Sequence, residues 1–495
     1  MLIRVSYQQL KKMIEKILSI KNIGRFTNYN LKTSEGWNGE LAKINIIYAP
    51  NGSGKTTLSL ILKSLKTKDS KLIEFKKSFN SNEEPYVSIL NSDSVNKRIE
   101  FKNKMWSSKL DKIDVFDIHY IEDYLFIGSR LYKKTKENLF ALLLGQKGLE
   151  FKNKCKPLIN KKDALVKKIR FAENKEKEKI QQKIIELELQ IAPVLKEYFE
   201  FSKDIFDQQI SLTNEYLNTF APYIKLTDFS YYQTGTELEI FRIFIKLNVR
   251  GNIVEFLTPD LTKKRPNAKF ALSEGDKSAI AISFFLARLG LNNTDNKIVV
   301  FDDPLSSFDH NRRNTTINNL AKIAPQCEQF FLFTHDIYFA RDFAQRINFE
   351  KPLNLKIYSD GNSSQIDIHD IYNETLSSFH KDLQTLKRYI DKPINTLSEN
   401  REVIRCIRPI LEGQIKNKYF YLPDDYWLGD IISTIRNSNN TDKINKLFPL
   451  IDKIIELNDY TKGYHHSSPS GINNTINPQE LRNYVNLLLD VIYEI

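Results

Sequence analysis

The stretch 48–57, Y-A-P-N-G-S-G-K-T-T, has the residue types that bind phosphate. An apolar run precedes it and a helical pattern follows it, which predicts a strand, a glycine-rich turn and a helix. Glycines let backbone N–H groups turn towards an anion, a lysine brings positive charge to the outer phosphates, and a threonine hydroxyl can bind magnesium. We therefore predict a nucleotide site formed by Asn51, Gly52, Ser53, Gly54, Lys55, Thr56 and Thr57, with Thr56 as a metal ligand.

Three later blocks could complete such a site. Ser273 and Gly275 open a helical run, where free backbone N–H groups and the helix dipole favour an anion. Asp302 and Asp303 end a buried apolar run. The first can orient magnesium, and the second can polarise an attacking water. His335 ends another apolar run and can reach the terminal phosphate.

In this order and spacing, the blocks resemble the ATP-binding-cassette (ABC) ATPases. The resemblance implies ATP hydrolysis, with ATP and Mg²⁺ as cofactors. It also implies a homodimer in which nucleotide lies between the phosphate loop of one subunit and the signature sequence of the other, and it leaves a higher oligomer open. The implied parts are the signature at Ser273 and Gly275, the magnesium aspartate Asp302, the catalytic acid Asp303, the D-loop ending at Asp309 and the switch histidine His335.

Two features depart from the cassette pattern. Asp303 stands where the family usually has Glu, and no clear Q-loop glutamine is found, Gln146 being only a candidate. The Asp302-Asp303-Pro304 form resembles one subgroup, the ATPases of bacterial phage-defence systems.

Changes in residue pattern divide the chain into four parts. From about residue 148 the chain becomes rich in Lys and Glu with apolar residues at helical spacing, which predicts a helical hairpin with arms of about 37 Å. An insertion at this place resembles the chromosome-maintenance and DNA-repair branch of the ABC ATPases. The predicted fold class is α/β, an SMC-like ABC-type P-loop ATPase with a short helical-hairpin insertion and an all-α C-terminal domain. The predicted domains are an N-terminal ATPase lobe at 1–147, the hairpin at 148–204, a C-terminal ATPase lobe at 205–369 and a helical effector or docking domain at 370–495.

Composition limits the class of protein. The 495 residues are 41% hydrophobic and 27% charged, which is typical of a soluble globular protein. No stretch reaches the ~20 apolar residues of a membrane span, and three scattered cysteines suggest no disulfide framework, so we expect a cytoplasmic protein without a membrane partner. The net charge of +12 gives mild support for a nucleic-acid partner.

The C-terminal part contains residue types suited to RNA cleavage without a metal. A base takes the ribose 2′ proton, an acid protonates the leaving oxygen, and an arginine stabilises the phosphorane. Arg408, Glu412, His465 and His466 could fill these roles. Pro409 lies between the first two, where proline is expected to kink or break a helix, and a plain ion pair beside a polar loop is an equal alternative.

This region resembles the C-terminal domain of the PrrC/RloC-type anticodon nucleases, which are ABC ATPases with an Arg-x-x-x-Glu helix and a later histidine followed by serine. The resemblance implies a tRNA substrate. The long zinc-hooked coiled coil of RloC-type members is missing, so a second resemblance stays open, to the PtuA-type ATPases of Septu and some retron systems. In that family a separate HNH nuclease subunit cuts, and the C-terminal domain would serve for docking. A DNA-repair ATPase is a third, weaker alternative.

Overall fold

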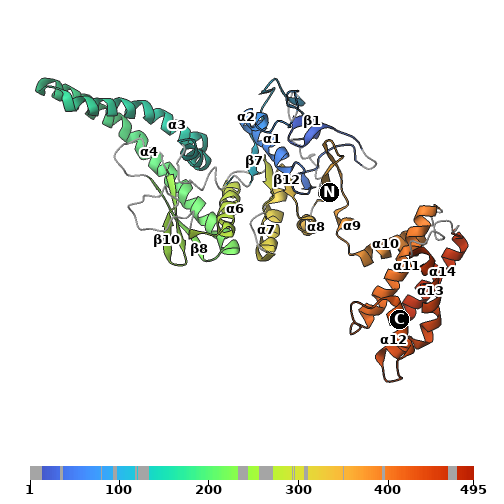
Figure 1. The fold of residues 1–495 in the computed structure, drawn as a ribbon. Helices are drawn as coiled ribbons and strands as arrows, with labels where there is room; N and C mark the ends of the chain where they lie inside the picture. The colour runs from blue at the N-terminus through green and yellow to red at the C-terminus, as the bar shows by residue number, and fades with distance from the viewer. Residues whose placement is uncertain are drawn as a thin grey trace, which may run out of the picture. The chain divides into compact units, whose positions relative to one another are not determined.

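The computed structural model describes residues 14–33, 37–79, 81–92, 97–117, 120, 133–231, 243–255, 271–291, 294, 296–305, 310–348, 350–392, 396–465 and 476–495. These residues form two compact units, Met1–His369 and Asp370–Ile495. Each unit is described by itself (Figure 1).

The centre of the first unit is a six-stranded sheet with the order β14-β13-β3-β12-β11-β7. Five of its strands run parallel, and only the edge strand β14 is antiparallel. The central strands β3, β12 and β11 are almost completely buried, because parallel strands are covered on both faces. Their bounds are β3 Ile44–Tyr48, β7 Ile113–Phe116, β11 Ile298–Asp302, β12 Gln329–Thr334, β13 Leu353–Ser359 and β14 Ser364–Ile368.

Helices cover both faces of this sheet. Phe331 of β12 belongs to the apolar core that includes α1, whereas its neighbour Phe330 stacks on Phe343 of α8 at 5.8 Å between ring centroids. Successive side chains of a strand point to opposite faces, so α1 and α8 lie on opposite sides. The helices are α1 Lys55–Thr67, α2 Lys71–Glu74, α7 His310–Ile323, η4 Ala324–Gln326 and α8 Ile337–Arg346.

A second, antiparallel sheet packs over the other side of α1 and shares its apolar core. Its order is β2-β1-β4-β5-β6, and the first strand expected from the sequence at 15–24 corresponds to β1. The strands are β1 Lys16–Ile23, β2 Phe26–Asn30, β4 Tyr86–Leu90, β5 Arg98–Lys102 and β6 Met105–Trp106.

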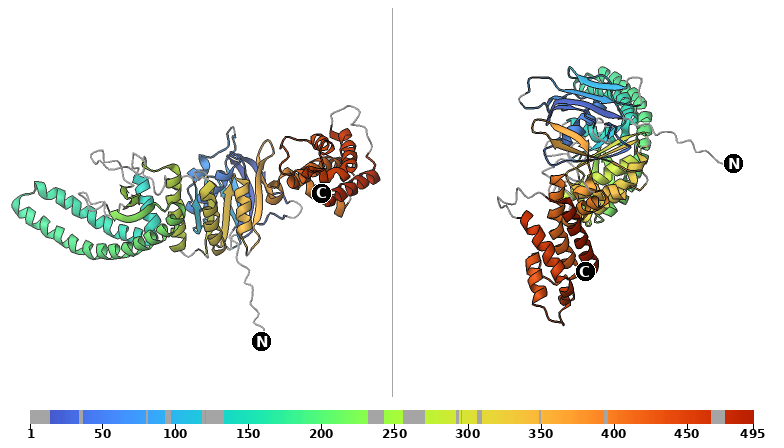
Figure 2. Two further views of the ribbon diagram at one scale, coloured as in Figure 1. Left: turned by 90° about the horizontal axis from the view of Figure 1, so that it is seen from below. Right: turned by 90° about the vertical axis from the view of Figure 1, so that its right-hand side faces the viewer.

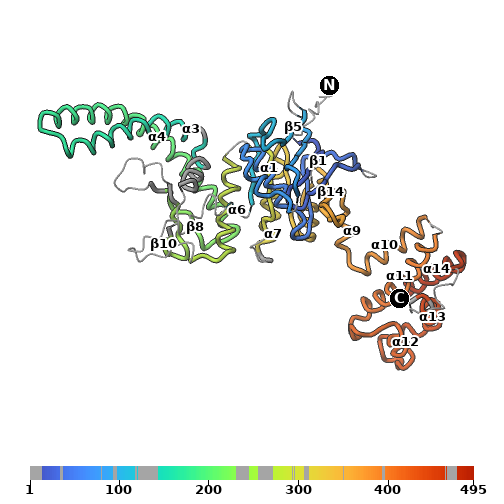
Figure 3. The backbone as a smooth tube through the Cα atoms, turned by 45° about the horizontal axis from the view of Figure 1, so that its top comes forward, coloured from blue at the N-terminus to red at the C-terminus, as the bar shows by residue number. Residues whose placement is uncertain are grey.

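A helical hairpin extends from a third sheet. Helices α3 and α4 run side by side (Figures 1 and 2), and α6 packs against the base of α4 (Figure 3). The helices are longer than the sequence suggested, because α3 begins before residue 148 and α4 continues past residue 204; α3 contains a break at Gly145, where φ is +57°. The elements are α3 Lys133–Lys168, η2 Ile169–Phe171, α4 Asn174–Phe220, β8 Ile224–Tyr231, β9 Ile243–Val249, β10 Asn252–Glu255 and α6 Glu274–Leu291.

The second unit is helical and has a core of its own. Helix α11 runs without interruption through Pro409, which contradicts the expected kink. Ile404, Ile407, Ile410 and Leu411 around the proline are fully buried, and this packing offsets the lost backbone hydrogen bond. The elements are α9 Ile371–Glu374, α10 Ser378–Asp391, α11 Leu397–Lys418, α12 Leu428–Arg436, η5 Lys443–Leu450, α13 Ile451–His465 and α14 Pro478–Glu494.

Among the described helices of both units, none is long and apolar enough to cross a membrane.

Candidate nucleotide-binding site

The order of the central sheet brings the separate sequence blocks together. Strands β3, β12 and β11 are parallel neighbours, with Tyr48 opposite Thr334 and Phe333 opposite Asp302. The residues that follow these strands therefore meet at one edge, where open α/β sheets bind their ligands. The phosphate loop, Asp303 and His335 lie there although more than 240 residues separate the first from the other two.

The phosphate loop has the backbone geometry of an anion cradle. Gly52 and Gly54 have φ of 79° and 116°, which L side chains rarely adopt. A Cβ atom at Gly54 would also lie 2.6 Å from Cε2 of Phe26. Lys55 Nζ donates to the carbonyl oxygens of Ala49 at 2.8 Å and Pro50 at 3.3 Å, and burial lowers its pKa. The ammonium group is thus held at the mouth of the loop.

A cavity of about 660 Å³ surrounds the loop, within the usual size range of ligand pockets. The cavity is basic, because together with Lys55 it is lined by Arg25, Lys76 and Lys77. These three residues were not among the site residues predicted from the sequence; the Gly24 turn before Arg25 was the only local signal. The predicted residues that line the cavity are Asn51, Gly52, Gly54, Lys55, Thr56, Thr57 and Asp303, whereas Ser53 is not part of the lining.

Asp302 lies beneath the phosphate loop and has the properties of a metal ligand. Ser59 Oγ donates to its Oδ2 at 2.8 Å, and its buried Oδ1 has no partner among the residues that the structure describes. Burial raises the pKa of Asp302 to about 6, aided by the carboxylates of Asp303 and Asp117 and opposed by hydrogen bonds from Ser59 and Thr56. Thr56 and Asp302 therefore fit a cation that would supply the missing partner.

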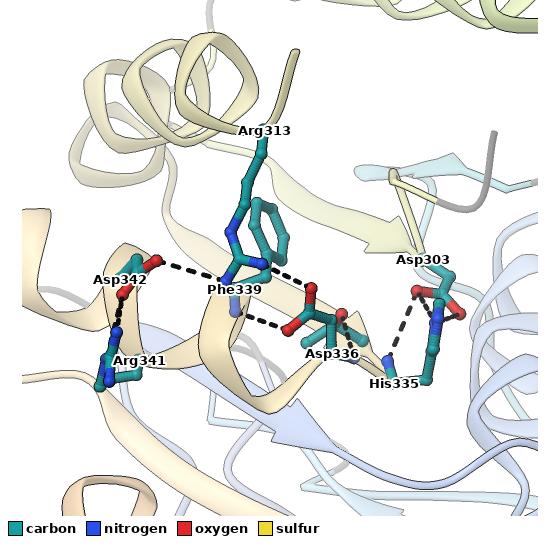
Figure 4. Close-up of polar contacts among 8 residues, drawn as sticks. Asp303, Arg313, His335, Asp336, Phe339, Arg341 and Asp342 are labelled. Atoms are coloured by element: carbon teal, nitrogen blue, oxygen red, sulfur yellow. Dashed lines mark hydrogen bonds and ion pairs between the residues drawn. The ribbon is translucent and has the colours of Figure 1, made fainter. Parts of the chain in front are cut away.

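Asp303 and His335 bind each other (Figure 4). The Nδ1 atom of His335 lies 2.7 Å and 2.6 Å from the two carboxylate oxygens of Asp303. Asp303 has φ of +53°, an uncommon value for a residue with a side chain, and its backbone N–H donates to Phe333 O at 2.9 Å. Its carboxylate is also 4.0 Å from Lys55 Nζ. The sequence placed these residues in one site but gave no sign of their direct contact.

A network of charged side chains stabilises the turn that carries His335. Arg313 of α7 contacts Asp336 at 2.8 Å and Asp342 at 3.2 Å, as Figure 4 shows. Asp336 also accepts from the backbone N–H of Phe339 and so caps α8 directly after His335. The network joins the start of α7 to the His335 turn. The sequence analysis missed it, because ion pairs between separate helices leave no spacing pattern.

The predicted signature residues lie at the start of α6 and form a local cap. Ser273 Oγ accepts from the N–H of Asp276 at 3.2 Å. The Asp276 carboxylate accepts from Tyr223 at 2.5 Å and from Arg312 at 3.3 Å, and its pKa is lowered by these bonds against the effect of burial. In the described part of the chain, neither Ser273 nor Gly275 lines the phosphate-loop cavity.

Several predicted residues lie elsewhere or outside the described residues. Asp309 and His466 are outside them, as are the side chains of Gln146 and His465. In the second unit, Arg408 Nε donates to Glu412 Oε1 at 2.9 Å, and the same oxygen accepts from the backbone N–H of Leu428 at 2.8 Å. The two residues therefore share a face of α11, and Glu412 also holds the start of α12.

A protein-family model described as an AAA domain matches residues 254–492. The match contains the strands that carry Asp302, Asp303 and His335, together with most of the second unit. The phosphate loop lies outside it. The fold is α/β, with the phosphate loop, Asp303 and His335 at one edge of a mostly parallel sheet.

The chain is also similar to solved Smc head domains. One from Pyrococcus furiosus, bound to the C-terminal domain of ScpA, is 12% identical with a TM-score of 0.40 and covers 76% of this chain and 99% of that one. One from Pyrococcus yayanosii is 10% identical with a TM-score of 0.43, covering 73% and 98%. One from Thermotoga maritima is 12% identical with a TM-score of 0.31, covering 72% and 100%. No curated protein sequence matches the chain.

Proposed function

We propose that the protein is a nucleotide-gated ATPase that acts as a homodimer in the cytoplasm and belongs to a bacterial anti-phage defence system. The observation that carries the ATPase is the common edge at which Lys55, Thr56 and Asp303 line one basic cavity. Asp302 and His335 lie at the same edge, next to Asp303. The defence role is supported by the Asp302-Asp303-Pro304 form and its resemblance to phage-defence ATPases.

The proposed reaction divides the work among these side chains. Lys55 exchanges its carbonyl partners for phosphate oxygens. Thr56 and Asp302 would hold Mg²⁺, which would supply positive charge against the phosphates. Asp303 orients the attacking water and accepts its proton, and His335 contacts the terminal phosphate after leaving Asp303. The Asp303–His335 contact thus represents a resting arrangement that nucleotide binding opens.

Hydrolysis by an Asp303→Asn chain tests this assignment. The variant keeps the shape of the side chain and loses the charge that polarises water, so it should bind ATP and Mg²⁺ normally and hydrolyse ATP about 10²–10⁴-fold more slowly. Asp111→Asn, the same change at an exposed carboxylate outside the cavity, is the matched control and should keep the wild-type rate. Wild-type hydrolysis by Asp303→Asn would remove Asp303 from the mechanism.

For the effector, we propose that the second unit cleaves RNA without a metal and that tRNA is its substrate. Support comes from α11, which keeps Arg408 and Glu412 on one face, and from α13, which ends at His465 and packs against α11. In this proposal His465 or His466 transfers the proton and Arg408 stabilises the phosphorane.

Total tRNA incubated with the purified chain tests the ribonuclease. The wild type should cut in the presence of nucleotide, and once gating is bypassed the cut should persist in EDTA and leave a 2′,3′-cyclic phosphate, because the ribose oxygen attacks. A chain with both His465→Ala and His466→Ala should lose cleavage and keep ATP hydrolysis; the double change prevents one neighbour from replacing the other. Cleavage that survives it would place the chemistry in another molecule.

The second candidate is a regulatory ATPase that holds a separate HNH nuclease. Two observations favour it. Glu412 already accepts hydrogen bonds from both Arg408 and the Leu428 N–H, which is typical of a residue with a structural role. Residues 370–495 contain 15 Lys and Arg against 17 Asp and Glu, so the positive charge of the chain resides in 1–369. RNA or DNA cleavage that appears only on adding such a nuclease, and that requires its metal, would establish this candidate.

A further inference from the structure

The second unit contains a groove that no proposed function has used so far. It lies between the end of α11, the α12 helix and the start of η5, and its volume is about 810 Å³. One wall is aromatic, with Phe420, Tyr421 and Tyr426, and the opposite wall is polar. The Arg408–Glu412 pair does not line it.

The aromatic wall forms an exposed corner. Phe420 is 85% exposed and Tyr421 is 49% exposed. Their ring centroids are 6.2 Å apart with an angle of 77° between the planes. A flat ring can therefore lie against the face of one side chain and meet the other edge-on, in the geometries that aromatic pairs favour.

The polar wall offers unused hydrogen-bonding groups. Ser433, Asn437 and Thr441 line the groove and are exposed, and within the described residues their side chains make no hydrogen bond. Asn437 has both a donor and an acceptor on one planar amide, which can pair with the edge of a base. The only cation and anion of the lining, Lys443 and Asp442, are adjacent.

These features fit a nucleobase better than a phosphate or an apolar side chain. A phosphate backbone needs clustered positive charge, whereas the unit has a slight excess of acidic residues. An apolar side chain of a protein partner would leave the hydroxyl and amide groups of the polar wall without partners. An unpaired base uses both walls, because it stacks on an aromatic ring and forms hydrogen bonds along its edge.

We propose that this groove binds an unpaired nucleobase of single-stranded RNA. The role of this site rests on the proposed ribonuclease function. That role is to select the unpaired nucleotide that is presented for cleavage. The base stacks on Phe420 within the Phe420–Tyr421 corner, and Asn437 reads its edge.

Binding of fluorescently labelled, short single-stranded ribo-oligonucleotides to the full chain in EDTA tests the groove directly. Oligomers with bases should bind more tightly than an abasic oligomer of the same length. Phe420→Ala should weaken binding by about tenfold to a hundredfold, the usual loss for a stacking side chain. Asn437→Ala should reduce the difference in affinity among oligomers of adenine, uracil and cytosine. Phe448→Ala and Asn440→Ala are matched controls, since both side chains are exposed in the same unit outside the groove, and they should bind like the wild type.

The outcomes separate the groove from the ribonuclease. If Phe420→Ala and Asn437→Ala bind all oligomers like the wild type, the groove proposal is wrong even where RNA cleavage is observed. If Phe420→Ala weakens binding and Asn437→Ala loses the discrimination among bases while no form of the chain cuts RNA, the groove stands and the ribonuclease fails. If Phe420→Ala instead abolishes association with a nuclease subunit and leaves RNA binding unchanged, the groove is a protein-docking site and the proposal is overturned.

Discussion

Glu412 offers a quantitative test, because one carboxylate oxygen serves two partners. Oε1 accepts from Arg408 at 2.9 Å and from the backbone N–H of Leu428 at 2.8 Å, and the Glu412 side chain is only 13% exposed. Glu412→Ala leaves a backbone donor at a buried residue without a partner, which costs about 1–3 kcal/mol. Loss of the partly buried i,i+4 ion pair adds about 0.5–1 kcal/mol. The expected total is about 2–4 kcal/mol.

Scanning calorimetry of the full chain would measure this loss in the transition of the second unit. For a unit of residues 370–495, an unfolding entropy of about 2.1 cal/mol/K per residue converts the loss into a Tm decrease of roughly 8–15 °C. Glu412→Gln is the matched control, since its amide oxygen still accepts from Leu428, and it should cost less than about 1.5 kcal/mol. Arg408→Ala should likewise cost little, because Glu412 keeps its bond to Leu428.

Equal melting of Glu412→Ala and Glu412→Gln would refute the reasoning, since it would show that the bond to Leu428 contributes nothing. The same pair informs the effector. A Glu412→Gln chain that melts near the wild type but no longer cleaves RNA would give the carboxylate a chemical role besides its structural one.

Three further predictions concern the first unit. Lys55→Ala should abolish ATP binding, measured by calorimetric titration, because the ammonium meets the ground-state phosphate charge; retained affinity would contradict this. Gly275→Arg and Lys55→Ala chains should each be inactive alone, but their mixture should recover one working site per heterodimer, and failure to recover activity in demonstrated heterodimers would argue against the composite site. In EDTA at pH 7, Asp302→Asn should raise the Tm of the Met1–His369 unit by about 4 °C. The folded pKa of Asp302 is about 6 against its ordinary 3.8, so the fold loses about 3 kcal/mol as pH rises from 4 to 6. The gain should vanish below pH 4; a gain independent of pH would refute the buried-charge explanation.

The sequence by itself determined the α/β class and the residues at the sheet edge. This was possible because the signals are local: each is an apolar run of strand length, followed directly by Asp303 or His335 or by the glycine-rich turn that leads to Lys55. Parallel strands bring such ends together whatever their separation along the chain. The helical hairpin was also visible from its apolar spacing, although its true helix ends, at 133 and 220, required contacts with the third sheet.

Only the tertiary structure decided how these residues are held and how the second unit is built. The Asp303–His335 contact, the Ser59–Asp302 bond and the Arg313 network each join segments far apart in sequence, so no spacing predicts them. At Pro409, by contrast, a local sequence signal led to a wrong prediction. Local backbone chemistry predicted a kink, but burial of the apolar residues around it stabilises the continuous helix by more than one backbone hydrogen bond is worth. Packing energy summed over many contacts decides such cases, and it exists only in the folded chain.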